Sequence, residues 1–552
     1  MNEFRTSLGE QIFHARYALN RDETWSQRAK TIVKDVCGRQ ERPTSISCHP
    51  LLSRDELHDL EHFIAAMKFI PGGRYVYYAG RGAKFWSNCF AYIAQEDTRE
   101  EWGRLVKAHS DALMTGGGVG CDYSIFRPYG EPLKRTGGVS SGPLPLMSSI
   151  NEIGRNVRQG GARRSAIYGS LNWQHGDIER FLVVKDWDNQ HLPNGMSYKD
   201  AKAIDFDFPA PLDGMNISVN WDDDWGFDPK NQIFVQNVKM AMCNGEPGFS
   251  FNTGEFSGET GRNACTEFTT KDDSDICNLG SVNMANIETL EEFQRIVYLS
   301  SKFLICGSIR AELPDQATLR TREKNRRIGL GLMGIHEWLL KRNYRYEIND
   351  ELRSWLDIYK HQSMQGANDQ CDRFYINRPT AYRAVAPTGT IGLLAGTTTG
   401  IESIYAVAYK RRWIENEDRK YKLVVDETAR TIIEKSGIEN PDDIETSVML
   451  ASDPERRIKF QADVQDYVDM AISSTLNLPA WGSELNNEDR VNDMAKIIAK
   501  YASRLRGLTF YPDGARGGQP ITPIPYADAI GHEDTVFEEH SDQQCKSGVC
   551  GI

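Results

Sequence analysis

The feature that most constrains the fold is a long alternation of short apolar segments, glycine-rich turns and amphipathic helices between about residues 86 and 420. The apolar segments include "SNCFAYIA", "NISVN", "DICNLGSVNMANI" and "YRAVAPTGTIG". Strands that alternate with helices over such a length build either an α/β barrel or a doubly wound sheet. The pattern therefore predicts an α/β fold for the central part of the chain.

The flanking regions differ from this central part. Residues 1–85 are expected to be helical, because "RDELHDLEHFIAAMKFI" spaces its apolar residues at helical intervals and residues 71–73, "PGG", are expected to end that helix. Residues 425–505 are expected to be mostly helical. From about residue 518 the chain is rich in proline, glycine and acidic residues and lacks periodicity, which predicts a flexible tail. Three regions are therefore expected: 1–85, 86–517 and 518–552.

Composition excludes several classes of protein. The 552 residues are 40% hydrophobic and 26% charged, as in globular proteins. A net charge of -12 argues against a broad DNA-binding face. No apolar run reaches the roughly 18 residues of a membrane-spanning helix, and the N-terminus does not resemble a signal peptide. Eleven cysteines without an export signal are typical of cytoplasmic thiols.

One stretch, "RNACTEFTTKDDSDICNLGS", concentrates reactive residue types. In an extended segment, side chains at alternate positions share a face, so Asn263, Cys265 and Glu267 are expected to point into one site. An amide and a carboxylate can bind a sugar diol while the sulfur lies against a carbon atom. This arrangement favours a redox active site.

Zinc binding and simple burial are the alternatives for these cysteines. Cys265 and Cys277 are widely spaced, and Cys545 and Cys550 have four residues between them, so neither pair has the close spacing of most zinc sites. Taken singly, a cysteine is most often a small buried apolar residue. We therefore expect no metal site in this chain.

These residues resemble a known family. "NACTE" resembles the Asn-x-Cys-x-Glu motif of ribonucleotide reductase catalytic subunits, and "CNLGSVNMANI" is similar to the segment that carries a second redox cysteine. Further matches follow in family order: "SNCF", "RQGGARRSA", "HGDIERFL", "RRIGLGLMGIHEWL", "APTGTIGLLAGTTTGIE", "LTFYPDGARGGQ" and a C-terminal cysteine pair. The resemblance spans about residues 70–552. It implies a ten-stranded α/β barrel with a finger loop at its centre.

The resemblance also implies an activity and the residues that perform it. The activity is the reduction of ribonucleotides to 2'-deoxyribonucleotides for DNA synthesis. Cys265 would become a thiyl radical that takes the 3'-hydrogen, Glu267 would be the general base on the 3'-hydroxyl, and Asn263 would hold the diol. Cys89 and Cys277 would supply a proton and two electrons and end as a disulfide.

The C-terminal cysteines have two interpretations. If they follow the family, Cys545 and Cys550 reduce the active-site disulfide by thiol–disulfide exchange and are then reset by thioredoxin or glutaredoxin. Alternatively they are incidental terminal thiols. Their position in an acidic tail favours exchange.

Substrate and effector residues are also assigned by the resemblance. The expected substrate contacts are Ser140, Ser141 and Arg163, together with a phosphate loop formed by Thr388, Gly389, Thr390 and Ile391. That loop could present backbone amides at a helix N-terminus, although an ordinary turn would have the same composition. Asp97, Arg127 and Lys134 are expected to bind a deoxynucleotide effector in a homodimer. "TGGGVGCD" is interpreted as a structural loop.

The radical source is left open by the sequence. Relatives that pair with a ferritin-like metal subunit relay the radical through two adjacent tyrosines, but here the local sequence is Phe510-Tyr511. The barrel motifs resemble the adenosylcobalamin-dependent class, which we favour, although no segment for covering a corrin is evident. Tyr511 could still act in a relay from a separate ferritin-like subunit.

Two further expectations concern regulation and other classes. Only 88 residues precede Cys89, which leaves little room for the ATP-cone domain through which dATP inhibits many relatives. A regulatory homologue without catalysis would lack some of the five catalytic positions, and all five are present. A glycyl-radical relative usually has four tail cysteines, whereas this tail has two.

Overall fold

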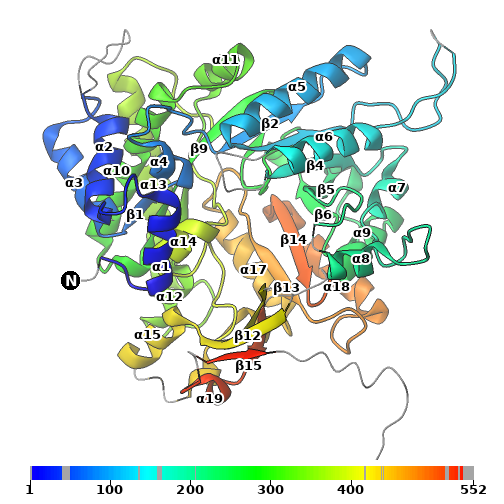
Figure 1. Cartoon of the computed structure of the whole chain (residues 1–552). Coiled ribbons are helices and arrows are strands. Elements are labelled where there is room, and N and C mark those ends of the chain that lie inside the picture. Colours follow the sequence, from blue (N-terminus) through cyan, green and yellow to red (C-terminus); the bar gives the residue numbers. More distant parts are fainter. Residues whose placement is uncertain are drawn as a thin grey trace, which may run out of the picture.

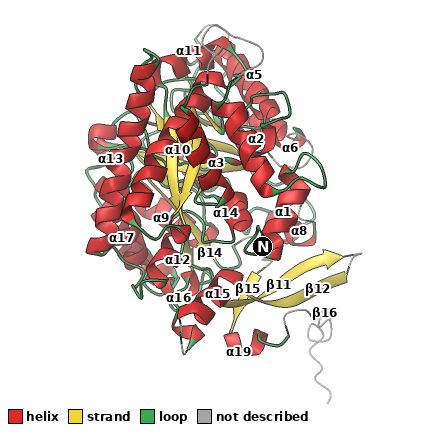
Figure 2. Cartoon of the chain, turned by 90° about the vertical axis from the view of Figure 1, so that its left-hand side faces the viewer, coloured by secondary structure: helices red, strands yellow, loops and turns green. Residues whose placement is uncertain are grey.

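A mixed sheet lies at the centre of the molecule, with helices around it (Figures 1 and 2). The computed structural model describes residues 3–39, 50–134, 137–157, 165–205, 207–415, 418–436, 438, 440–515, 521–532 and 535–538. No helix in this part of the chain is both long and apolar enough to cross a membrane. The predicted α/β class is confirmed.

The central sheet of the described residues has ten strands in the order β1-β9-β2-β3-β4-β5-β6-β14-β13, and β10 also pairs with β9. The strands are β1 (Phe69–Pro71), β2 (Cys89–Ile93), β3 (Gly118–Asp122), β4 (Ile167–Asn172), β5 (Met215–Trp221), β6 (Gly248–Phe251), β9 (Asp275–Asn283), β10 (Ile328–Met333), β13 (Thr475–Leu478) and β14 (Gly507–Pro512). Strands β2 to β6 run parallel, and β9 is antiparallel to β2.

The ladders between these named strands do not close into a ring, so by themselves they do not form the closed ten-stranded barrel that we expected. Two isolated parallel bridges lie outside these ladders. Leu330 of β10 pairs with Arg383, and Val385 pairs with Ile472, which precedes β13. The segment around residues 383–385 therefore lies between β10 and the chain that leads into β13.

Helices connect the strands and cover the sheet. They are α1 (Ser7–Ile12), the π-helical turn η1 (Phe13–Tyr17), α2 (Trp25–Cys37), α3 (Arg54–Ala65), α4 (Gly73–Tyr78), α5 (Arg99–Thr115), α6 (Leu144–Asn156), α7 (Ile178–Leu182), α8 (Tyr198–Ile204), α9 (Gln232–Asn244), α10 (Leu290–Arg310), α11 (Gln316–Asn325), α12 (Ile335–Leu340), α13 (Asp350–Arg373), α14 (Gly389–Ala395), α15 (Glu427–Ser436), α16 (Ser447–Leu450), α17 (Pro454–Gln465), α18 (Val491–Tyr501) and α19 (Tyr526–Ala529). Many begin at a side-chain cap. Thr98 caps α5 and Thr289 caps α10, which satisfies amides that the first turn leaves without a partner.

The N-terminal region contains helices α1 to α4 and also supplies a strand to the central sheet. Helix α3 ends at Ala65, and Met67 then takes a positive φ of 53°. The following residues, Phe69–Pro71, pair with β9. The expectation that residues 71–73 end the helix was therefore wrong. Burying Phe69 and Ile70 completely against the sheet outweighs continuing the helix.

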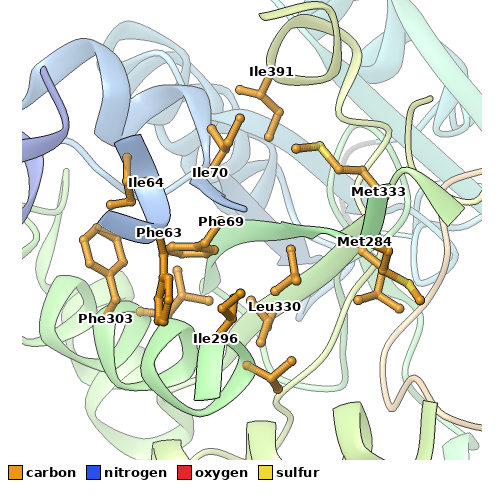
Figure 3. Close-up of a cluster of buried hydrophobic side chains, with 14 of the residues drawn as sticks. Phe63, Ile64, Phe69, Ile70, Met284, Ile296, Phe303, Leu330, Met333 and Ile391 are labelled. Atoms are coloured by element: carbon orange, nitrogen blue, oxygen red, sulfur yellow. The ribbon is translucent and has the colours of Figure 1, made fainter. Parts of the chain in front are cut away.

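A hydrophobic core joins this region to the sheet (Figure 3). Figure 3 labels Phe63, Ile64, Phe69, Ile70, Met284, Ile296, Phe303, Leu330, Met333 and Ile391. Each buried aliphatic or aromatic side chain of this kind stabilises the fold by about 1.5–3 kcal/mol relative to exposure. Ile391 belongs to the predicted phosphate loop, so the core also fixes the position of α14.

The C-terminal region contains more regular structure than the sequence predicted. Strands β15 (Ile521–Ile524) and β16 (Val536–Glu538) flank the hairpin of β11 (Ala408–Glu415) and β12 (Asp418–Val425) in a four-stranded sheet (Figure 2). Phe537 of β16 stacks on Tyr421 with a ring-centre distance of 5.0 Å. Strand addition therefore orders residues that lack periodicity of their own. Cys545 and Cys550 lie outside the described residues.

Candidate active site

The residues of the "NACTE" motif lie on a turn at the tip of a short hairpin. Strands β7 (Gly261–Arg262) and β8 (Thr269–Thr270) form the hairpin. The Thr266 N–H donates to the Asn263 carbonyl oxygen at 3.1 Å, and Thr266 has a φ of +69°. The expected extended segment was therefore wrong, because the chain must reverse direction here. Asn263, Cys265 and Glu267 nevertheless all line one cavity.

Arg262 anchors the base of this hairpin. Its buried guanidinium donates to the Ser250 hydroxyl at 2.6 Å, to the Arg506 carbonyl at 2.6 Å and to the Thr266 carbonyl at 3.3 Å. Burial lowers the pKa of Arg262 to about 10, so the side chain stays protonated at neutral pH. Arg262 thus ties the turn to β6 and to the residue preceding β14.

The predicted catalytic side chains meet around Cys89. The Asn263 side-chain amide donates to Cys89 Sγ at 3.0 Å, and the Cys89 thiol faces Glu267 Oε1 at 3.6 Å. Cys277 is the direct partner of Cys89 in the antiparallel β2–β9 ladder. Both residues are buried thiols in this structure. Directly opposed residues on antiparallel strands are close enough for their side chains to interact, so the two thiols could form a disulfide with small local shifts.

Burial sets the protonation of these groups. It raises the pKa of Glu267 to about 7, against the lowering effect of its hydrogen bonds with its own backbone, Asn263 and Cys89. Burial also raises the pKa of Cys89 and Cys277 well above the ordinary thiol value. At neutral pH the carboxyl group can therefore exchange a proton, while both thiols keep theirs.

A cavity of about 210 Å³ connects these groups to the predicted phosphate loop. Its lining consists of Tyr17, Gly72, Gly73, Arg74, Asn88, Cys89, Gly116, Gly118, Ala166, Asn263, Ala264, Cys265, Glu267, Leu279, Gly280, Ser281, Ala386, Pro387, Thr388, Gly389, Thr390 and Ile391. Cys265 is half-buried on this wall. The cavity therefore brings Cys89, Cys265 and Glu267 into one site with the loop, whereas Cys277, the ladder partner of Cys89, is not among its lining residues.

The loop at residues 388–391 is braced on two sides. Thr388 adopts a left-handed conformation with a φ of 47°, and its hydroxyl accepts a hydrogen bond from the Gly400 N–H at 2.8 Å. Ile391 is buried in the core. A side chain at Gly389 would meet open space, so this position leaves room for a bound group.

Other predicted residues lie apart from this cavity. Arg127 forms an ion pair with Asp97, and the Ser140 hydroxyl donates to the Arg127 carbonyl at 3.4 Å. Ser141 and Lys134 are exposed. None of these five residues lines the cavity. The half-buried Tyr511 on β14 does not line it either. Arg163 lies outside the described residues.

The chain matches the family described as "Ribonucleotide reductase, barrel domain" over residues 87–223, 231–362 and 378–511. The chain belongs to the ribonucleotide reductase family. It is similar to the "Vitamin B12-dependent ribonucleoside-diphosphate reductase" of Thermoplasma acidophilum, with 25% identity over 84% of this chain and 66% of that protein. For the protein of the same name from Mycobacterium tuberculosis H37Rv, identity is 24% over 97% of this chain and 82% of that protein.

A third relative has a different substrate in its name. The "Adenosylcobalamin-dependent ribonucleoside-triphosphate reductase" of Euglena gracilis is 27% identical over 57% of this chain and 44% of that protein. Ribonucleotide reductases of both substrate types are therefore similar to this chain.

Several residues on the wall of this reductase cavity were missed by the sequence analysis. They are Tyr17, Gly72, Gly73, Arg74, Asn88, Gly116, Gly118, Ala166 and Ser281. Gly116 and Gly118 belong to "TGGGVGCD", which we had interpreted only as a structural loop. Two signals could have been used. The glycine pair of "PGGR" is one, because a chain that approaches a ligand closely often needs glycine. The position of Asn88 directly before Cys89 is the other. Nothing in the local pattern around Tyr17 indicated its position.

Replacing Glu267 by glutamine is expected to change stability in a pH-dependent way. The folded-state pKa is raised from 4.5 to about 7, so the folded reductase holds this proton more tightly than the unfolded chain does. The wild type therefore loses stability as pH rises from about 4.5 to about 7, and the variant does not. The free energy of unfolding of the variant, relative to that of the wild type, should therefore increase by on the order of 3 kcal/mol between about pH 4 and about pH 8.

Urea unfolding of both proteins across that pH range measures this gain. Glu259→Gln is the matched control, because burial raises the pKa of Glu259 but Arg506 and Arg327 together lower it below 4.5. Its stability relative to the wild type should therefore change only below about pH 4.5, where a carboxylate with a depressed pKa takes up its proton. A flat difference between Glu267→Gln and the wild type would contradict the raised pKa.

Proposed function

We propose that this chain reduces ribonucleotides to 2'-deoxyribonucleotides through a thiyl radical at Cys265. The observation that carries the proposal is the single cavity in which the half-buried Cys265 lies beside Glu267 and Cys89. Membership of the ribonucleotide reductase family supports it. Relatives are named for diphosphate and for triphosphate substrates, so the phosphate chain length is left to experiment.

Each side chain has one role in the proposed reaction. The Cys265 radical takes the 3'-hydrogen, and Glu267 takes the proton of the 3'-hydroxyl. The 2'-hydroxyl then leaves as water. Cys89 and Cys277 give two electrons and two protons and form a disulfide, and Cys265 returns the 3'-hydrogen. In sum, a ribonucleotide and two thiols become a deoxyribonucleotide, a disulfide and water.

The protonation of the site supports these roles. A general base works best when its pKa lies near the working pH, and that of Glu267 is about 7. The thiols of Cys89 and Cys277 have raised pKa values because of their burial, so they carry the protons that the reduction consumes. The Asn263 side chain, which already contacts Cys89, would orient the ribose.

The phosphate loop is proposed at residues 388–391, because it forms part of the same cavity wall. Its backbone amides and threonine hydroxyls are neutral donors of the kind that bind phosphate. Ser140 contacts Arg127 and is not among the residues that line the cavity. We therefore group Ser140 and Ser141 with the proposed effector residues Asp97, Arg127 and Lys134, at the interface of a homodimer. Arg163 remains a proposed substrate contact.

The ten-stranded barrel is proposed as the complete form of the central sheet. The bridges Leu330–Arg383 and Val385–Ile472 would connect β10 to the chain that leads into β13. The parallel β13–β14 ladder would then complete the ring. This closure would surround the β7–β8 hairpin, which carries Cys265, with strands.

Adenosylcobalamin is the radical source that the site favours. Tyr511 is not among the residues that line the cavity, and its neighbour Phe510 is a buried residue that lacks a hydroxyl. The half-buried Cys265 and the open space at Gly389 fit a group bound directly at the cavity. Ala264 and Cys265 would contact that group. When bound, adenosylcobalamin supplies the radical that activates the Cys265 thiol.

Activity of the purified chain with adenosylcobalamin alone tests this proposal. We expect turnover with cobalamin and a dithiol reductant, and Tyr511→Phe should keep at least half of it. A parallel assay would use a metal-loaded ferritin-like subunit instead of cobalamin. Turnover only with that subunit, and its loss in Tyr511→Phe, would contradict the cobalamin assignment but leave the role of Cys265 intact. No deoxynucleotide under either condition would contradict the proposed function.

A further inference from the structure

The N-terminal segment reaches the active-site cavity through a π-helical turn. Helix α1 passes into η1 (Phe13–Tyr17), in which the Ala18 N–H donates to the Phe13 carbonyl at 3.0 Å. Phe13 is fully buried and meets Trp25 edge-on, with ring centres 5.7 Å apart. Tyr17, four residues later, is also buried and belongs to the same hydrophobic core as Phe13. Single π-turns of this kind occur frequently at functional sites.

Tyr17 is one of the residues that line the cavity of Cys265. Arg81 fixes its backbone by donating to the carbonyl oxygens of Tyr17 at 3.2 Å and Ala18 at 2.8 Å. The Tyr17 hydroxyl lies 3.0 Å from the point that a Cβ at residue 73 would occupy, and the ring carbon that bears the hydroxyl lies 3.8 Å from it. A side chain at residue 73 would crowd the Tyr17 hydroxyl, so glycine at this position leaves the hydroxyl the room that it occupies.

The same segment packs on α14, whose N-cap and first turn contain the proposed phosphate-binding residues 388–391. Helix α1 lies beside α14 (Figure 1), and a Cβ at Gly9 would be 2.7 Å from the Leu394 carbonyl oxygen. Arg5 pairs with the buried Glu337 at 2.8 Å, and Glu337 accepts a hydrogen bond from Thr397 at 2.9 Å. The N-terminal segment thus contacts both the cavity and the structure that holds residues 388–391.

The polarity of the cavity indicates what this hydroxyl could do. Among the described lining residues, Arg74 is the one cationic side chain, although a nucleoside diphosphate or triphosphate is strongly anionic. Arg163, a proposed substrate contact, lies outside the described residues. Among the described lining residues, neutral hydroxyls accompany Arg74 as hydrogen-bonding groups, at Ser281, Thr388, Thr390 and Tyr17. Of these, Tyr17 comes from a separate N-terminal segment.

We propose that the Tyr17 hydroxyl hydrogen-bonds the bound ribonucleotide, so that the N-terminal segment forms part of the substrate site. This inference rests on the proposed function, since it names a further residue for the same substrate. A hydroxyl near sugar and phosphate oxygens can donate one hydrogen bond and accept others. Tyr17 is a binding residue in this proposal and takes no part in the radical steps.

Tyr17→Phe tests the proposal, because it removes one oxygen atom and keeps the ring. Calorimetry with the reduced chain, without cobalamin, would measure the binding of a ribonucleoside diphosphate and a triphosphate. Loss of one neutral hydrogen bond is expected to weaken the binding of the true substrate by about three- to tenfold. In the assay with cobalamin, KM should rise by a similar factor while kcat changes less than about twofold. Tyr344→Phe, whose hydroxyl bonds Glu351 at the surface, should bind like the wild type.

Gly73→Ala provides an independent measurement of the same contact. The added methyl group would lie 3.0 Å from the Tyr17 oxygen but 3.8 Å from the nearest ring atom that remains in Tyr17→Phe. Gly73→Ala should therefore weaken nucleotide binding in the chain that keeps Tyr17. In the Tyr17→Phe chain it should weaken binding little further. The two substitutions then form a double-mutant cycle with a non-zero coupling energy. An equal loss in both backgrounds would overturn the proposal, because the methyl group would then act on the nucleotide directly.

The outcomes separate this inference from the proposed function. If the wild type binds no ribonucleotide, the proposed function itself is contradicted. If the wild type binds and Tyr17→Phe binds equally well with an unchanged melting temperature, only the role of Tyr17 is overturned. Weaker adenosylcobalamin binding with unchanged nucleotide binding would also overturn it, since the hydroxyl would then contact the cofactor.

Discussion

Cys265→Ser is expected to lower the rate of deoxynucleotide formation by at least about a thousandfold, which corresponds to roughly 4 kcal/mol of lost transition-state stabilisation. Serine is nearly the same size as cysteine, so it should fit the turn between β7 and β8. Its O–H bond, however, is too strong to form a radical that exchanges hydrogen reversibly with a sugar carbon. The substitution therefore removes the chemical step and leaves the cavity in place.

The measurement is product formation under single-turnover conditions, with nucleotide binding followed separately by calorimetry. Binding should stay within about twofold of the wild type, because a thiol and a hydroxyl differ little in hydrogen bonding at this scale. Cys243→Ser is the matched control, since Cys243 is also half-buried but lies on α9, outside the cavity lining. Turnover by Cys265→Ser above the level of contaminating enzyme would refute the assigned role.

The second large effect is expected at the paired thiols on β2 and β9. Cys89→Ser and Cys277→Ser should each abolish multiple turnover, whether the reductant is thioredoxin or a small dithiol. The reason is stoichiometric: two electrons must come from one disulfide-forming pair, and these two residues are direct partners in the ladder. Assays with both reductants, on each variant, measure the effect. Sustained turnover by either variant would show that the electrons come from elsewhere.

The C-terminal cysteines supply the contrast for this prediction. Cys545→Ser combined with Cys550→Ser should lose turnover with thioredoxin and keep it with the small dithiol, because a shuttle can be bypassed and the substrate-reducing pair cannot. Equal loss with both reductants would mean that the tail does more than carry electrons. Equal activity with both would mean that Cys545 and Cys550 are incidental.

The residues to which we assign catalytic roles stand in short motifs, so the sequence alone was enough to propose them. "NACTE" and "CNLGS" identified Cys265, Glu267 and Cys277 without any knowledge of strand pairing, and "SNCF" identified Cys89. The local shape of the first motif was not predictable in the same way. Alternating side chains suggested an extended segment, whereas the Thr266–Asn263 hydrogen bond closes a turn. Turn formation depends on the pairing of β7 with β8, which a five-residue pattern does not report.

The ends of the chain were less predictable than its centre. Phe69–Pro71 becomes a strand because β9 offers a partner and the core accepts Phe69 and Ile70. Residues 536–538 become a strand because the edge of β12 is close by. In both cases ladder hydrogen bonds to a distant strand override the weak local preference of the segment, and for Phe69 and Ile70 burial adds to them.

The sequence by itself determined the family, the α/β class and the thiol, carboxylate and amide groups of the site, since these depend on residue identity and short spacings. Only the tertiary structure decided that Cys89 pairs with Cys277, that Tyr17 lines the cavity, and that the Ser140 hydroxyl donates to the Arg127 carbonyl. These relations join residues far apart in the chain, and they are set by which strands pair and which surfaces are buried. The raised pKa of Glu267 has the same origin: the carboxyl group is acidic in the unfolded chain, and removal of water by the folded protein makes it a base near neutral pH.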